Sequence, residues 1–307
     1  MLPGSLASGS YAQRDLAVIT HQQLPEYYDW LSRYVQLTNW LAYRDRFASF
    51  TMHKRLGIEP AEHAGGHRRT AGVEYVNERV LAVADLPPTP RVLDAGCGFG
   101  GTIFHWQPRI GGRYEGITLS RVQLAVAQRE ARRRGIADVC RFRLQSYDEP
   151  LGTGFDAVVA IESLIHSPDL RHTLSNLSGA LQPGGVLLLL DDMAACDLNR
   201  HRPAEARLLR RHWGCARYWT YDDYRTALGR AGLSLRHEED LSALMRPRPE
   251  EILDRLERVY SLLHRRIPLH PARTVVSAYL GGIALERLHA SGDVRYRLLV
   301  AARGERS

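Results

Sequence analysis

Lysine is nearly absent from this sequence: of its 41 lysine and arginine residues, Lys54 is the single lysine. The formal net charge is +7. Because arginine binds phosphate and carboxylate groups bidentately, this bias fits anion recognition. It also fits a codon bias towards arginine, since the arginines are spread over the whole chain. No basic tract or aromatic RNA-binding motif accompanies them, so we expect no nucleic-acid partner.

The four cysteines do not have the spacing of a zinc site or a disulfide framework. Cys97, Cys140, Cys196 and Cys215 are scattered without a CxxC pair. No apolar run approaches the roughly 18 residues that span a bilayer. Residues 1–15 lack a basic stretch followed by an apolar one, so no export signal is expected. We therefore expect a cytoplasmic protein without a membrane span.

The 307 residues are expected to form one large domain with insertions. An N-terminal tail and helical cap is predicted over 1–84, with helical patterns over 24–56 and 71–84. The main domain is predicted over 85–307. Lid insertions are expected near 192–222 and 245–290.

From residue 91 onwards, short apolar runs alternate with helical segments. The runs are "RVLDAG", "RYEGITL", "RFRLQS", "FDAVVAIE" and "GVLLLLDD". This alternation predicts βαβ units and a parallel sheet. A weaker strand over 233–242, a long helical stretch over 248–290 and a strand over 294–303 follow. The predicted fold class is α/β, with a doubly wound, mostly parallel seven-stranded sheet, N-terminal helices and helical lid insertions.

The segment "VLDAGCGFGGT", residues 92–102, is a glycine-rich turn after a buried strand. Gly96, Gly98 and Gly101 satisfy GxGxxG, and Glu115 stands where a dinucleotide-binding protein has its ribose acid. The position of Asp94 argues against a dinucleotide as the ligand. It lies two residues before the first glycine, where its carboxylate can meet an ammonium group. The motif also follows some 90 residues of mainly helical pattern, and "LQPGGVLLLL" over 181–190 adds a turn before a buried strand.

The two segments resemble motif I and the pre-strand-five signature of S-adenosylmethionine (SAM)-dependent methyltransferases of class I. The resemblance covers about residues 80 to 190. It implies that SAM is the cofactor and S-adenosylhomocysteine (SAH) the product. It also implies that Asp94, Gly96, Gly98 and Gly100 hold the methionine part of SAM.

The segment "EGITLSRVQ", residues 115–123, resembles cyclopropane-fatty-acid synthases and prenyl diphosphate C-methyltransferases. The resemblance implies that Thr118, Leu119 and Gln123 approach the ribose. Ser120 and Gln123 also have the spacing of a helix capping box. We expect Ser120 to cap a helix, whereas both interpretations stay open for Gln123.

The adenine position departs from the common pattern of this family. "LQSYDEP", residues 144–150, has no acid where the family commonly has one. Gln145 and Ser146 are the predicted adenine contacts. Ile161, the last apolar residue of a strand, completes the predicted cofactor set.

The segment "AIESLIHSPDL", residues 160–170, places Glu162 directly after a buried strand. Such a carboxylate is costly unless something pairs with it. Ser167 and Pro168 are predicted to start a helix as N-cap and first helical residue. Residues 162–166 then form a loop that faces the cleft at the carboxyl end of the sheet.

This segment resembles sterol C-24 methyltransferases and, more distantly, tocopherol and prenyl diphosphate methyltransferases. The resemblance implies that Glu162 is a base or stabilises a carbocation. Two alternatives remain: Glu162 binds substrate or SAM without proton transfer, or it is structural. His166 is a second polar contact, a proton relay or a loop-packing residue. No metal ligands with recognisable spacing accompany them.

Substrate contacts are expected from the N-terminal helix and from the arginine-rich segment 199–219. The candidates are Tyr28, Arg202, Trp213, Tyr218 and Trp219, with arginines gripping a diphosphate and aromatic rings enclosing a prenyl chain. The alternative is an amphipathic lid helix with a solvated basic face, and aromatic residues that only pack.

The sequence predicts methyl transfer to an alkene carbon of a small isoprenoid-like molecule, with a prenyl diphosphate as one candidate. The alternative is an O- or N-methyltransferase of a specialised metabolite. A SAM-binding protein without catalysis is disfavoured by the intact glycine turn and Glu162. Mg²⁺ is expected only with a diphosphate. The oligomeric state, including a homo-oligomer, stays open.

Overall fold

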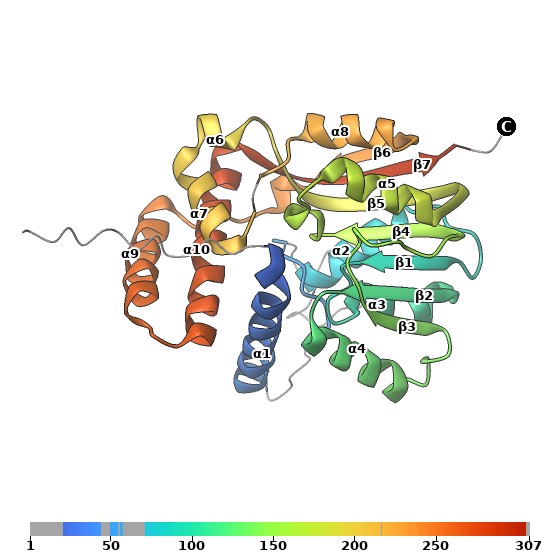
Figure 1. Cartoon of the computed structure of the whole chain (residues 1–307), viewed down its shortest axis with the longest axis horizontal. Helices are drawn as coiled ribbons and strands as arrows, with labels where there is room; N and C mark the ends of the chain where they lie inside the picture. Colours follow the sequence, from blue (N-terminus) through green and yellow to red (C-terminus); the bar gives the residue numbers. More distant parts are fainter. Residues whose placement is uncertain (1–20, 44–49, 55, 58–70, 216, 305–307) are drawn as a thin grey trace, which may run out of the picture.

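Seven strands form one mixed sheet in the order β3-β2-β1-β4-β5-β7-β6 (Figure 1). The computed structural model describes residues 21–43, 50–54, 56–57, 71–215 and 217–304. The strands are β1 Arg91–Ala95, β2 Arg113–Thr118, β3 Cys140–Leu144, β4 Phe155–Ile161, β5 Leu181–Ala194, β6 Leu233–Asp240 and β7 Val294–Arg303. Strands β1 to β5 are parallel, whereas β7 runs antiparallel to both β5 and β6. The prediction of a mostly parallel seven-stranded sheet is confirmed.

Helices cover both faces of the sheet. Helices α2 (Ala71–Ala82), α3 (Gly101–Ile110) and α4 (Arg121–Arg133) share one apolar cluster with the sheet. Helices α5 (Leu170–Ala180) and α8 (Tyr221–Arg230) share a second cluster. Successive strand residues alternate between the clusters. Both faces are thus buried, which is why the central strands read as continuous apolar runs.

The remaining helices form a layer beside the carboxyl ends of the parallel strands (Figure 1). They are α1 Leu24–Tyr43, α6 Leu198–His201, α7 Pro203–Trp213, α9 Glu250–Arg266 and α10 His270–Ser291. The described residues also form the 3₁₀ turns η1 His21–Gln23, η3 Leu164–His166 and η4 Ser242–Leu244. Helix α10 packs against α1, α7 and α9. Within the described part of the chain, none of the helices combines the length and apolar character of a membrane span.

Two helix predictions were wrong in extent. The predicted helix over 24–56 ends at Tyr43 as α1, and residues 50–54 are irregular. The predicted stretch over 248–290 is two helices, because α9 ends before Pro268. A proline disfavours helical backbone in the residue before it, and Ile267 has ψ 114. The predicted division of the chain at residues 84 and 85 stays a prediction.

The predicted helix start at Ser167 and Pro168 was wrong by two residues. Asp169 is the N-cap of α5, because its carboxylate accepts hydrogen bonds from the backbone N–H groups of Arg171 and His172. Ser167 instead ends η3 and shares a hydrogen bond of 2.8 Å with Thr173 Oγ1. A carboxylate favours the positive end of a helix dipole, which explains why Asp169 takes the cap.

Candidate functional site

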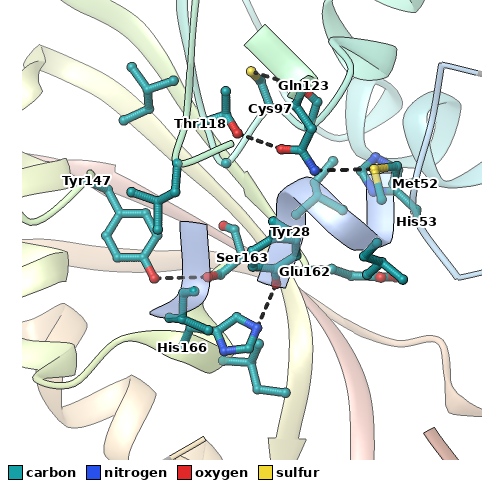
Figure 2. A pocket seen from close by; sticks show the side chains of 18 of the residues that line it. Tyr28, Met52, His53, Cys97, Thr118, Gln123, Tyr147, Glu162, Ser163 and His166 are labelled. Atoms are coloured by element: carbon teal, nitrogen blue, oxygen red, sulfur yellow. Dashed lines mark hydrogen bonds between the residues drawn. The ribbon is translucent and has the colours of Figure 1, made fainter. Parts of the chain in front are cut away.

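A cavity of about 300 Å³ opens at the carboxyl ends of the parallel strands β1 to β5 (Figure 2). Its floor is formed by the glycine-rich turn after β1 and by the segment after β4. Its other walls come from α1, from residues 50–54 and from Trp213 at the end of α7. The volume lies within the range of small-molecule sites, roughly 300–1,000 Å³.

The glycine-rich turn requires glycine for two different reasons. Gly96, Gly98 and Gly100 have φ values of 99, 54 and 88, in the region that other residues rarely adopt. A Cβ on Gly96 would also lie 2.5 Å from Ser163 Cβ. Gly96 and Gly98 line the cavity. Gly100 packs against the rings of Phe104 and Phe142 and lies outside the lining residues.

Asp94 lies buried beneath the turn, with 4% of its surface exposed. Its Oδ2 has no hydrogen-bond partner among the described residues. Burial raises the pKa of Asp94 to about 7. A buried carboxylate in this state gains from a cation, so the site fits the ammonium group of a bound amino-acid cofactor. Asp94 itself does not line the cavity.

The end of β2 presents a hydroxyl to the cavity, and the first turn of α4 presents an amide (Figure 2). Thr118 Oγ1 donates to Gln123 Oε1 at 2.6 Å, and Gln123 Nε2 donates to Met52 Sδ at 3.5 Å. Leu119 lines the same wall. Ser120 caps α4 as predicted, because its Oγ accepts from the backbone N–H of Gln123. The Gln123 side chain does not complete the capping box but points to Thr118.

The predicted adenine contacts also line the cavity. Gln145 Nε2 donates to the backbone oxygen of Pro150 at 2.9 Å, and Ser146 Oγ accepts from the backbone N–H of Asp148 at 3.1 Å. Ile161 at the end of β4 lies in the wall as well. These side chains come from the ends of β3 and β4, as the sequence predicted.

Glu162 lines the cavity, and its carboxylate is held by hydrogen bonds and an ion pair. Tyr296 Oη donates to Glu162 Oε1 at 2.7 Å, and the backbone N–H of Lys54 donates to the same oxygen at 2.9 Å. Lys54 Nζ lies 3.6 Å from Glu162 Oε2. The backbone of Glu162 has φ 50, an uncommon value for a residue with a side chain. The site therefore fixes this carboxylate with two donated hydrogen bonds and one ion pair.

His166 and Tyr28 meet across the cavity wall (Figure 2). His166 Nε2 and Tyr28 Oη share a hydrogen bond of 2.6 Å, and the two rings stand edge to face. Burial, with smaller effects of Tyr27 and Cys215, raises the pKa of Tyr28 well above its usual range. The phenol therefore keeps its proton at neutral pH.

Sequence reasoning missed Lys54, Met52, Asp191 and Asp192 as lining residues. Lys54 Nζ lies 2.5 Å from Asp192 Oδ2, and His289 Nε2 lies 2.9 Å from Asp192 Oδ1. Burial opposes ionisation of Asp192, but Lys54 and His289 outweigh it and lower its pKa to about 2. One signal was available: two consecutive acids follow "LLLL" at the end of a buried strand.

Three of the five predicted substrate contacts lie outside the cavity lining. Arg202 is ion-paired with Glu205 at 2.7 Å and Asp293 at 2.6 Å. Tyr218 is buried in an apolar cluster, and Trp219 donates to the backbone oxygen of Ser167. Tyr28 and Trp213 do line the cavity.

No group of three or more His, Cys, Asp or Glu side chains among the described residues is arranged to hold a metal ion.

Residues 93–187 match the family described as "Methyltransferase domain". The chain is 29% identical to methyltransferase GfsG of Streptomyces halstedii, over 67% of the chain and 74% of that protein. It is 45% identical to geranyl diphosphate 2-C-methyltransferase of Saccharopolyspora erythraea, over 33% of the chain and only 35% of that protein. Other matching proteins are methyltransferases named for transfer to carbon, oxygen or nitrogen.

The fold is similar to that of geranyl diphosphate C-methyltransferase from Streptomyces coelicolor, solved with Mg²⁺, geranyl diphosphate and SAH. The TM-score is 0.65 at 20% identity, over 90% of this chain and 97% of that one.

Proposed function

The chain is a SAM-dependent methyltransferase of the class I fold, and we propose that it methylates a hydroxyl group of a largely apolar small molecule. The observation that carries this proposal is the 2.6 Å hydrogen bond between Tyr28 Oη and His166 Nε2 at the cavity wall. A hydroxyl must lose its proton when it attacks a methyl group. A positioned imidazole is the side chain that most often takes such a proton.

Tyr28 and His166 form a proton relay in this proposal. The acceptor hydroxyl gives its proton to Tyr28 Oη while the phenol proton of Tyr28 passes to His166 Nε2. Tyr28 thus ends neutral and His166 carries the charge. The raised pKa of Tyr28, due first to burial, supports this role, because the phenol is protonated and able to donate. The relay requires the tautomer of His166 in which Nε2 carries no proton.

When bound, SAM supplies the electrophilic methyl group. The chain's own residues align the reactants and exclude water. We assign the cofactor contacts to three groups at the strand ends: Asp94, Gly96 and Gly98 to the methionine part, Thr118, Leu119 and Gln123 to the ribose, and Gln145 and Ser146 to the adenine. Trp213 on α7 packs within reach of Gly281 on α10, and we propose that these two helices form a lid over the acceptor.

Glu162 is a fixed negative charge in this proposal and not the base. Its oxygens already accept hydrogen bonds from Tyr296 and from the Lys54 backbone and pair with the Lys54 ammonium. Taking a proton would weaken all three contacts. His166 Nε2 instead shares its hydrogen bond with a phenol, which can pass a proton to it.

The lining supports an apolar acceptor over a diphosphate. No arginine lines the cavity among the described residues, and its basic side chains are Lys54, His53 and His166. Lys54 is engaged by Asp192 and Glu162. A diphosphate would therefore lack the bidentate partners that arginine offers. Apolar and aromatic side chains dominate the wall instead: Leu24, Tyr27, Leu31, Tyr147, Ile165 and Trp213.

A second candidate is methyl transfer to an alkene carbon of an isoprenoid. The 45% identity to geranyl diphosphate 2-C-methyltransferase over 105 residues favours it. Glu162 would then stabilise a carbocation, with aromatic neighbours helping.

The test uses SAM with a deuterated methyl group and two substrate panels, hydroxylated metabolites and prenyl diphosphates. We expect label on oxygen, located by mass spectrometry and NMR. We expect His166→Gln and Tyr28→Phe to lower kcat by about 10²-fold or more, with SAM affinity unchanged in calorimetry. Arg132→Met, an exposed change on α4, is the matched control. Deuterated methyl groups found only on carbon, or a His166→Gln variant with the kcat of the wild type, would contradict the proposal of hydroxyl methylation.

A further inference from the structure

The single lysine of the chain connects two sides of the cavity. Lys54 belongs to residues 50–54, which we call the strap, between α1 and α2. Its Nζ contacts two carboxylates, Asp192 on β5 at 2.5 Å and Glu162 directly after β4 at 3.6 Å. It also lies 5.0 Å from the ring centre of Tyr296 on β7. A compact ammonium group with rotatable donors suits two acceptors in different directions better than a planar guanidinium does.

The carboxylates on the sheet side depend on this lysine. Asp192 has 1% of its side chain exposed, and His289 is its other ionisable partner. Breaking a buried ion pair by removing one partner leaves the other charge uncompensated. The left-handed backbone of Glu162 adds to this dependence, since such a conformation persists only when its surroundings hold it.

The other residues of the strap contact the glycine-rich turn. A Cβ on Gly101 would lie 2.6 Å from Thr51 Cα, and Met52 Sδ accepts from Gln123 Nε2 at 3.5 Å. His53 Nε2 lies 3.3 Å from Thr102 Oγ1, at the start of α3. Thr51, Met52 and His53 thus contact the glycine-rich turn and the residues beside it, while Lys54 contacts the carboxylates of Glu162 and Asp192.

We propose that Lys54 is a positioning residue that latches the strap over the bound cofactor and holds the Glu162 backbone in place for it. The ion pairs with Asp192 and Glu162 close the strap, and Met52 then covers the Thr118–Gln123 wall. The inference rests on the proposed function only in that the cavity binds SAM. It is independent of the acceptor and of the atom that is methylated.

The first test compares Lys54→Met, Lys54→Arg and the control Arg132→Met by calorimetric titration with SAM and with SAH. We expect Lys54→Met to raise both Kd values by about tenfold or more, which corresponds to about 1.4 kcal/mol. We expect Lys54→Arg to restore part of the affinity, because it keeps the charge. Circular dichroism establishes that each variant is folded. Wild-type affinity in a folded Lys54→Met protein would overturn the proposal.

The second test uses the wild-type chain, so it does not depend on a variant that folds. Lys54 is the only side-chain amine, so among the side-chain amines acetylation by an amine-reactive ester reports on Lys54 alone. We expect saturating SAH to slow acetylation of Lys54 by about tenfold or more, measured by peptide mass spectrometry, while the α-amino group reacts at an unchanged rate. Equal Lys54 rates with and without SAH would refute a latch.

The two proposals fail separately in these tests. Loss of SAH protection removes the latch but leaves hydroxyl methylation intact. Label on carbon in the substrate test removes hydroxyl methylation but leaves the latch intact.

Discussion

The buried histidine pair under the helical layer predicts a specific loss of stability in acid. His212 on α7 and His264 on α9 both bond to Ser277 Oγ on α10, at 3.2 and 3.1 Å. Their rings stand edge to face, 5.0 Å apart. Burial lowers the pKa of His212 to about 3 and that of His264 to about 4, with further effects of neighbouring cations. Both side chains are therefore neutral in the folded protein at neutral pH.

The sign and size of the effect follow from linkage. An unfolded histidine has a pKa of about 6.5, so below that pH the unfolded chain binds protons that the folded chain does not. The stability contribution is present above pH 6.5 and is lost as the pH falls towards the folded values. The contribution of each histidine to the free energy of unfolding falls by up to about 1.4 kcal/mol for each pH unit. Allowing for solvent screening, we expect the pair to lose about 2 kcal/mol in total between pH 7 and pH 5.

Urea denaturation at pH 7, 6 and 5 measures this loss, with a His212→Gln, His264→Gln double variant for comparison. Glutamine keeps hydrogen-bonding groups for Ser277 but does not titrate. The difference between the two proteins isolates the histidines from the carboxylates, which also titrate in this range. We expect the double variant to lose about 2 kcal/mol less than the wild type. Parallel pH profiles for the two proteins would refute the reasoning.

Two further predictions concern the glycine-rich turn. Gly96→Ala should abolish measurable SAM binding in calorimetry, because the added Cβ meets Ser163 Cβ at 2.5 Å where φ is 99; unchanged affinity would show that the turn moves freely. Asp94→Asn should weaken SAM binding by about tenfold or more. The same change should raise the unfolding free energy of the ligand-free protein at pH 8 by about 1 kcal/mol or more. Burial raises the pKa of the Asp94 carboxyl to about 7, so at pH 8 the folded protein holds a buried charge that asparagine lacks. A less stable Asp94→Asn protein at pH 8 would contradict the second part.

Local features of the chain were sufficient to predict the sheet and one wall of the site. The strands β4 and β5 are apolar on both faces, and their identity does not depend on distant residues. The turn around Gly96 was equally visible, because its φ values demand glycine at fixed spacing. The end of α1 was not visible, since the aromatic pattern of the sequence continues past Tyr43, whereas residues 50–54 are irregular.

The ion pairs of the site were beyond sequence reasoning. Lys54 and Asp192 are 138 positions apart, and no local pattern links a lone lysine to the second of two acids near the end of β5. Their pairing depends on how the strap crosses the sheet, which is a tertiary property. The same holds for Tyr28 and His166, which sit on separate elements. Arg202 was predicted to contact the substrate, but the structure places it in ion pairs with Glu205 and Asp293. The sequence alone did not indicate that these two acids lie beside it.

The antiparallel strand β7 constrains the order in which the sheet can be completed during synthesis. β7 lies between β5 and β6, although it follows both in the chain and is separated from β6 by α9 and α10. Until residues 294–303 leave the ribosome, β5 has an open edge that carries the apolar run Leu187–Leu190, and β6 has no strand to join. Open apolar edges of this kind pair readily with other chains. A nascent or truncated chain that ends before residue 294 is therefore expected to depend on chaperones and to aggregate when they are scarce.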